Sequence, residues 1–190
     1  MFLMRRPSSQ QIARFLDESK ALTLSYEPEG IAQSTHPGFN ADEQVAVVGS
    51  GAADYLRGVT ALTEWKHFQL GWVDIFPARA PIVPGTVVAV AIRHLGFWSL
   101  NGCRVLYPTG EASGSTFGFA YGTLPNHAES GEELFEVGLD RHTGEVSYRI
   151  RAVSRPRATL ARLASPYTRL LQARFRRESA LAVRRAIDGR

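Results

Sequence analysis

The chain has 190 residues, of which 44% are hydrophobic and 21% are charged, so it is long enough for one domain with a buried core and is not compositionally disordered. No run of about 18 apolar residues is present, which excludes a membrane-spanning helix. The N-terminal stretch MFLMRRPSSQ lacks the long apolar region of a signal peptide, and the single cysteine, Cys103, has no partner for an internal disulfide. Both observations favour the reducing cytoplasm, and we expect a single domain over residues 1–190.

Charge is distributed unevenly along the chain, although the formal net charge is only +4. Residues 151–190 contain eleven arginines and two acidic residues, whereas residues 1–150 contain eleven basic and sixteen acidic residues. The simplest interpretation is that arginine coats the solvent face of a C-terminal helix, and no nucleic-acid partner is expected. Peripheral contact of this arginine-rich helix with an anionic membrane surface is an alternative that stays open.

The first third of the chain is predicted to contain two helices, a long loop and a short strand. Ser8 or Ser9 can cap a helix in QQIARFLDESK, and the prolines and glycines of residues 21–40 predict a long loop. EQVAVVG predicts a short strand, and GSGAADYLRGVTALTEWKHF repeats apolar residues at helical spacing. The glycines of this last segment lack the lysine and the extended pattern of a phosphate-binding loop, so we interpret them as a turn before the helix.

The middle of the chain is predicted to be antiparallel β-structure. The strand candidates, separated by Gly, Pro, Asn or Asp, are WVDIF, TVVAVAIRH, WSLNGCRVLY, STFGFAYGTL, ELFEVGL and EVSYRIRAV. No alternation of strands and helices is present in this region, so a doubly wound nucleotide-binding fold is not expected.

A long C-terminal helix is predicted from about Pro166 to Ile187. In its predicted orientation, Tyr167, Leu171 and Phe175 lie on the sheet, and Arg169, Arg176 and Arg184 lie in solvent. An antiparallel sheet with one polar face must cover its other face, and this helix is the available cover. The order of elements therefore predicts an α+β fold in which a curved antiparallel sheet wraps around the C-terminal helix, with shorter N-terminal helices.

Long segments of the chain resemble one protein family. They include FQLGWVDIFP, RHLGFWSLNGCRVLY, FGFAYGTLPNHAESGEELFEV and SRPRATLARLASPYTRLLQARF. In this order they are similar to the domain-of-unknown-function family 1990 (DUF1990), also catalogued as UPF0548, over nearly the whole chain. The resemblance implies a START-like, helix-grip architecture. Proteins of that architecture commonly hold lipids, hormones, polyketides or other apolar molecules between sheet and helix, but the resemblance implies no particular activity.

The stretch HLGFWSLNGCR, residues 94–104, is mostly apolar but contains polar groups able to bind a ligand. Strand alternation puts one set of residues on one face, Trp98, Leu100, Gly102 and Arg104, and a second set on the other face, Ser99, Asn101, Cys103 and Val105. Four residues are expected to border one cavity beneath the terminal helix: Trp98, Arg104, Tyr121 and Tyr148. His94 and Asn101 complete the expected ligand-binding set. In the alternative interpretation these residues only fill the core and stabilise the turn.

A second polar cluster, YGTLPNHAESGEE, contains His127, Glu129 and Glu133 in a loop that leads into a strand. His94 or His127 together with Glu129 is the candidate acid–base pair. A metal site would need such groups to converge on one point, whereas loop residues usually face water, so neither a metal nor another cofactor is expected. The remaining histidines lie at turns or helix ends and are expected to face solvent: His36, His67 and His142.

Together these patterns predict an intracellular protein that binds a small hydrophobic or amphipathic molecule in a cavity between the sheet and the C-terminal helix. The alternative is an enzyme of the cyclase, dehydratase or hydrolase type that uses a histidine and a carboxylate in the same cavity. The interpretation leans away from an enzyme because no nucleophile has a defined partner. The two hypotheses differ in whether a histidine and an acid meet inside the cavity within hydrogen-bonding distance.

Overall fold

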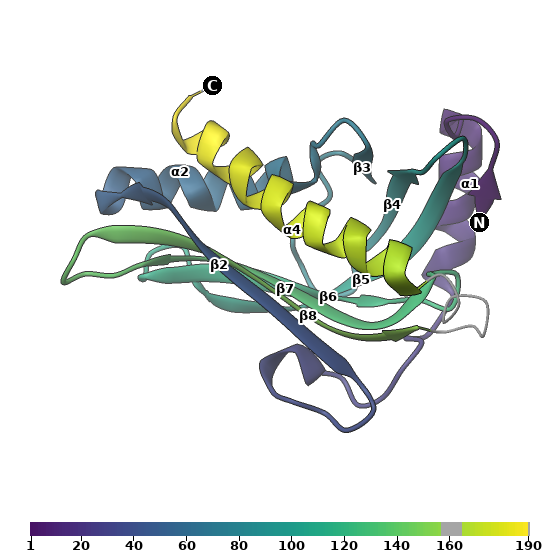
Figure 1. Cartoon of the computed structure of the whole chain (residues 1–190), viewed down its shortest axis with the longest axis horizontal. Helices are drawn as coiled ribbons and strands as arrows, with labels where there is room; N and C mark the ends of the chain where they lie inside the picture. The colour runs from purple at the N-terminus through teal and green to yellow at the C-terminus, as the bar shows by residue number, and fades with distance from the viewer. Residues whose placement is uncertain (157–164, 190) are drawn as a thin grey trace.

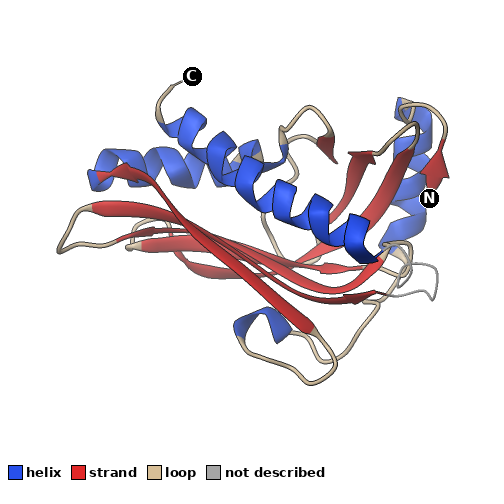
Figure 2. Ribbon diagram, in the orientation of Figure 1, coloured by secondary structure: helices blue, strands red, loops and turns tan. Residues whose placement is uncertain are grey.

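A curved antiparallel sheet with helices on both faces forms the protein in this computed structural model, which describes residues 1–156 and 165–189 (Figure 1). The strands are β1 (Phe2–Leu3), β2 (Asn40–Ser50), β3 (Val73–Phe76), β4 (Val87–Arg93), β5 (Trp98–Glu111), β6 (Thr116–Thr123), β7 (Glu129–Leu139) and β8 (Glu145–Pro156). The helices are α1 (Ser9–Lys20), α2 (Gly51–Thr63) and α4 (Ser165–Ile187), with the short 3-10 helices η1 (Ile31–Gln33) and η2 (Lys66–Phe68). The predicted fold class, an α+β chain with a curved antiparallel sheet around the C-terminal helix, is confirmed (Figure 2).

The main path of the sheet has the strand order β2-β8-β7-β6-β5-β4-β3, and each neighbouring pair is antiparallel. From β3 to β8 each strand pairs with the next one along the chain, whereas β2 pairs with β8 and forms the far edge. The short β1 pairs with the first residues of β5, opposite Trp98 and Ser99, where β6 does not accompany that strand. The sheet is therefore an open half-barrel, with β2 and β3 at the two ends of the path.

The concave face of the sheet holds the main core. Alternate residues of β6, β7 and β8 point into it, including the fully buried Phe119, Phe135 and Tyr148. Trp65 and Phe68, which follow α2, pack edge to face on this layer, with ring centroids 4.8 Å apart for Trp65 and Phe119 and 5.5 Å apart for Phe68 and Phe135. Both α2 and α4 cover these aromatic rings, and the two helices contact each other.

The convex face is covered by α1 at one end. This helix begins with a capping box, in which Ser8 Oγ accepts a hydrogen bond from the Gln11 N–H and Gln11 Oε1 accepts one from the Ser8 N–H. Phe15 of α1 packs on Ala89, Ala91 and Leu100 of β4 and β5. The predicted cap at Ser8 is confirmed, and β5 is buried from both sides of the sheet.

The loop 21–39 lies on the convex face, and one of the groups that hold it there is the buried carboxylate of Glu132. Its oxygens accept hydrogen bonds from the Tyr26 hydroxyl at 2.7 Å, the Tyr107 hydroxyl at 3.0 Å, and the N–H groups of Gly30 and Ala32 at 2.7 Å and 2.9 Å. Burial, together with the Glu132 carboxylate, raises the pKa of both tyrosines, which therefore stay protonated as donors. A carboxylate with four donors is stable in a buried position.

The orientation predicted for the C-terminal helix is confirmed in most of its residues. Leu171 and Phe175 pack against the concave core, and Arg169 and Arg184 are exposed. The predicted position of Arg176 is wrong, because its side chain is only 16% exposed and lies 3.8 Å from Asp42 of β2. No helix in the described part of the chain is long and apolar enough to cross a membrane.

Candidate functional site

The N-terminal half of α4, residues 167–178, packs less closely on the sheet than the C-terminal half. None of its side chains is fully buried, whereas the C-terminal half contains the buried residues Ser179, Ala180, Ala182, Val183 and Ile187. A cleft of about 610 Å³ opens between the N-terminal half and the ends of β2, β7 and β8. We call it the polar cleft, after the polar lining residues Asn40, Asp42, Glu129, Ser154, Thr168, Arg169, Gln172 and Arg176.

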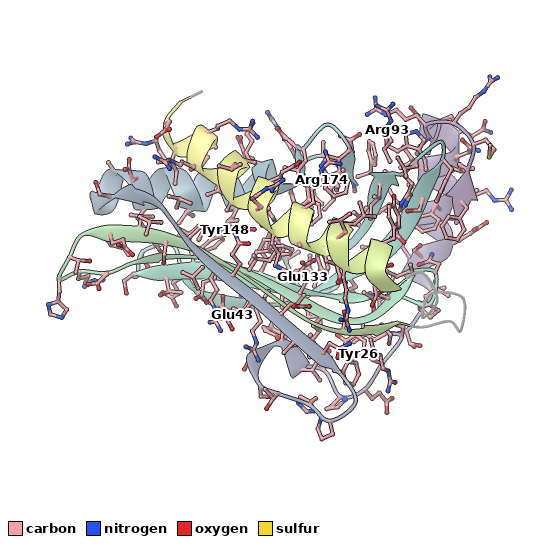
Figure 3. The ribbon with its side chains drawn as sticks, viewed as in Figure 1. Tyr26, Glu43, Arg93, Glu133, Tyr148 and Arg174 are labelled. Carbon is pink, nitrogen blue, oxygen red and sulfur yellow. The ribbon has the colours of Figure 1, made fainter. Side chains whose placement is uncertain are left out.

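A carboxyl group beneath α4 is linked to this cleft by Arg176. Glu133 alternates on β7 with the buried Phe135, which places it on the concave face (Figure 3). The Tyr121 hydroxyl donates a hydrogen bond of 2.7 Å to its Oε2 atom. Burial raises the pKa of Glu133 to about 7, although the Tyr121 hydrogen bond and the positive charge of Arg176 oppose the shift. Glu133 can therefore gain or lose a proton near neutral pH.

Sequence reasoning did not include Glu133 in the expected ligand-binding set. The signal that identifies it is its alternation with Phe135 and Val137, which predicts that all three side chains point to the same apolar face. A carboxyl group on the apolar face of a strand is unusual and marks a candidate functional position.

Other polar side chains meet where the turn between β4 and β5 approaches the start of α4. His94 Nε2 lies 2.9 Å from Ser99 Oγ, and His94 Nδ1 lies 3.3 Å from the Tyr167 hydroxyl. Asn101 Nδ2 donates to the same Ser99 hydroxyl over 2.9 Å. Burial lowers the pKa of His94, so its ring is neutral at pH 7. The structure thus brings His94 and Asn101 together at the Ser99 hydroxyl, and His94 joins the hairpin to α4.

The expected position of Trp98 and Arg104 is wrong. They share one face of β5, as the alternation predicts, but this is the convex face, away from α4. Trp98 packs with the α1 cluster, and Arg104 donates hydrogen bonds of 3.0 Å and 2.7 Å to the carbonyls of Lys20 and Leu22. Because α1 covers one face of β5 and the main core covers the other, alternation alone cannot tell which face meets α4.

Tyr121 and Tyr148 lie on the concave face, opposite to Trp98 and Arg104, so the four residues do not border one cavity. Tyr148 is fully buried, and its hydroxyl lies 2.6 Å from Ser179 Oγ of α4. The Tyr121 ring packs against Phe135, with centroids 5.3 Å apart, while its hydroxyl reaches Glu133. Tyr148 therefore fastens the packed half of α4 to the sheet, and Tyr121 is the member of the set that faces the titratable carboxyl group.

The predicted histidine–carboxylate pair does not form. His127 Nδ1 accepts a hydrogen bond of 2.9 Å from the backbone N–H of Glu129, and burial lowers its pKa to about 4. The Glu129 carboxylate instead accepts a hydrogen bond of 3.4 Å from Ser154, and burial raises its pKa. Among the described residues neither His94 nor His127 is hydrogen-bonded to a carboxylate, and no three His, Cys, Asp or Glu side chains converge as metal ligands.

His67 is buried, so the expectation that it faces solvent is wrong. Its ring stacks on Trp65 with centroids 5.7 Å apart and lies 4.7 Å from the Phe135 ring, and neither ring nitrogen has a hydrogen-bond partner among the residues that the structure describes. Burial lowers the pKa of His67 to about 3. The sequence places this residue at a helix end, but η2 lies beneath α4 in the fold. His67 is therefore part of the core and does not line the polar cleft.

A curved antiparallel sheet that grips a C-terminal helix is the START-like helix-grip fold. The chain is similar to the crystal structure of the Zhui aromatase/cyclase from Streptomyces sp. R1128, with a TM-score of 0.54 and 10% sequence identity. The match covers 79% of this chain and 94% of that chain. At this level of identity the likeness shows the fold alone.

The chain belongs to the family described as Domain of unknown function (DUF1990), which matches residues 25–182. A UPF0548 protein from Dictyostelium discoideum is 31% identical over 195 residues, which cover 92% of this chain and 90% of the relative. A UPF0548 protein from Deinococcus radiodurans is 32% identical over 200 residues, covering 98% of each chain. The family resemblance seen in the sequence segments is confirmed.

Proposed function

We propose that this protein binds a small amphipathic molecule between the sheet and the N-terminal half of α4. The observation that carries the proposal is the polar cleft, which lies between α4 and the ends of β2, β7 and β8. Its volume of about 610 Å³ falls within the range of roughly 300–1,000 Å³ that is typical of small-molecule sites. The helix-grip fold supports the same location, between sheet and helix.

The lining indicates the chemistry of the ligand. Asp42, Glu129 and Arg176 offer both acceptors and donors, so the part of the ligand in the polar cleft needs hydrogen-bonding groups. Leu171 and Phe175 lie on the same half of α4, are only partly buried, and offer apolar contact on the side that meets the core. A ligand with a polar end and an apolar body fits this division better than a purely hydrophobic one.

The second candidate function is an enzyme on the same scaffold, and the observation that favours it is Glu133. A carboxyl group with a pKa near 7 and a hydrogen-bonded tyrosine suits general acid–base catalysis, so Glu133 and Tyr121 replace the histidine–carboxylate pair in this hypothesis. Binding is the better supported function, because neither Glu133 nor Tyr121 is among the residues that line the polar cleft.

Two measurements test the binding proposal. Native mass spectrometry of the freshly purified protein should detect a co-purifying small molecule. Titration with the amphipathic dye 8-anilinonaphthalene-1-sulfonate should give saturable binding that Ala173→Trp weakens by about tenfold or more, since the indole would fill the polar cleft. Leu181→Trp is the matched control, because Leu181 is 49% exposed elsewhere on α4. Equal dye affinity in wild type and Ala173→Trp would contradict the assignment of the site.

A further inference from the structure

One end of the molecule exposes several large apolar side chains. β1, α1 and the turn between β4 and β5 meet there (Figure 1). Phe2, Met4 and Leu95 are 70%, 82% and 87% exposed. We call these three residues the apolar tip. Exposed apolar residues scattered singly need no explanation, but a group of them marks an interaction surface.

The strand register holds the apolar tip together. Phe2 lies opposite Ser99 and Leu3 opposite Trp98, which brings Met4 level with the hairpin turn that contains Leu95. The Phe2 ring packs edge-on against Phe97, with centroids 5.8 Å apart. Phe97 in turn stacks on His94 at 4.4 Å, and His94 contacts Tyr167 of α4. The tip is therefore supported by a continuous row of rings and is not a loose end of the chain.

Arginines surround the apolar tip. Arg5, Arg6 and Arg93 are all exposed, and Figure 3 labels Arg93 at this end of the molecule. Arg6 pairs with Asp74 over 2.8 Å. Neither Arg5 nor Arg93 has an acidic partner in the described part of the chain, so both guanidinium groups are available to an external anion.

We propose that the apolar tip inserts into the interface of an anionic lipid bilayer, with Arg5 and Arg93 bound to lipid phosphates. Leu95 projects from a hairpin turn, so it offers no groove that would fit a peptide. A lipid interface accepts projecting side chains without matched shape, and apolar side chains flanked by arginine are suited to anionic lipid. This proposal does not depend on ligand binding in the polar cleft.

The test is co-sedimentation of the full chain with vesicles of phosphatidylcholine and phosphatidylserine at a ratio of about 7:3, compared with vesicles of phosphatidylcholine alone. We expect binding to the anionic vesicles that weakens as salt rises. Met4→Ser with Leu95→Ser should weaken it by about tenfold or more. The matched control is Leu56→Ser with Val83→Ser, because these residues are 56% and 52% exposed elsewhere on the surface. All four positions are exposed, and thermal unfolding verifies that both variants fold.

Two double variants that each remove two arginine charges locate the contact with the vesicle. Arg5→Gln with Arg93→Gln should weaken vesicle binding and reduce its salt dependence, whereas Arg177→Gln with Arg184→Gln on α4 should change neither. A loss of binding in the α4 variant alone would overturn the proposal and move the contact to α4. So would an absence of wild-type binding, or unchanged binding in the Met4/Leu95 variant. Sedimentation velocity tests the remaining case, in which the wild type does not bind vesicles. If the wild type is then a dimer and the Met4/Leu95 variant is a monomer, the apolar tip is a self-association surface instead.

Discussion

The two halves of α4 are built from one continuous helix but meet the sheet in different ways. Val183 and Ile187 in the C-terminal half are buried against α2 and the sheet, at a place where Gly58 allows a close approach. A Cβ atom at Gly58 would lie 2.9 Å from a methyl group of Val137 and 3.5 Å from one of Ile187. The N-terminal half has no fully buried side chain and borders the polar cleft. One half thus provides stability, and the other borders the cleft in which we propose that a ligand binds.

The largest expected effect is a difference in the free energy of unfolding between variants of the two halves. Ile187→Ala should lower the free energy of unfolding by about 2–5 kcal/mol, because it leaves a cavity in a fully packed region. Leu171→Ala removes a partly buried side chain beside the cleft and should cost less than about 1.5 kcal/mol. Denaturant unfolding of both variants measures the difference. Similar losses would mean that the two halves are packed alike.

His67 provides a second test of the packing beneath α4, because its ring lies in the aromatic core layer that this helix helps to cover. The unfolded chain takes up a proton at this histidine near its ordinary pKa of 6.5, whereas in the folded protein the pKa is about 3. The folded state therefore loses stability as the pH falls from about 6.5 to 3, by about 3 kcal/mol between pH 7 and pH 4. In His67→Phe this loss should disappear. Unfolding free energies measured across this range would contradict the account if the wild-type and variant curves ran parallel.

Glu133 should show the opposite dependence on pH. Its pKa in the folded protein is about 7, above the ordinary 4.5, so ionisation costs the folded state stability as the pH rises from about 4.5 to 7. Glu133→Gln keeps an acceptor for Tyr121 and removes this cost. We expect the variant to match wild type at pH 4 and to exceed it by on the order of 1–2 kcal/mol at pH 8, after allowance for partial exposure. A constant difference at both pH values would rule out the titration.

The smallest effects compare two neighbouring arginines. Arg177 is exposed, and Arg177→Gln should change the free energy of unfolding by no more than about 0.5 kcal/mol. Arg176→Gln removes a partly buried charge that lies near Asp42 and acts on Glu133, and it should cost about 1 kcal/mol. Dye affinity should change only in Arg176→Gln. Equal unfolding free energies and equal dye affinities in the two variants would contradict a role of Arg176 in the cleft.

Much of the fold could be predicted from local patterns in the sequence. The alternation of Val146, Tyr148 and Ile150 identified β8, and each of these residues is fully buried. The strand predicted in EQVAVVG proved longer, over Asn40–Ser50, because its first residues pair with the end of β8. The two-residue β1 was not predicted, since it is a strand only through its pairing with β5. Boundaries set by a distant strand cannot be read from local periodicity.

The candidate site was harder to predict because it depends on which side of each strand meets α4. Alternation grouped Trp98 with Arg104 and Ser99 with Asn101 correctly, but both faces of β5 are buried, so the pattern fits either assignment. Glu133 was missed, although it alternates on β7 with Phe135 and Val137, which both lie in the main core. The alternation pattern does not show which face of a strand is covered by a helix from another part of the chain.

The hydrogen bonds of Glu132 have a consequence for the opposite side of the sheet. They hold the loop 21–39 on the convex face, and this loop ends at Phe39, which forms part of the wall of the polar cleft. Arg155 at the end of β8 lies over the Phe39 ring, 4.6 Å from its centroid, and adds a further attachment. Glu132 thus helps to position one wall of the cleft without being among the residues that line it.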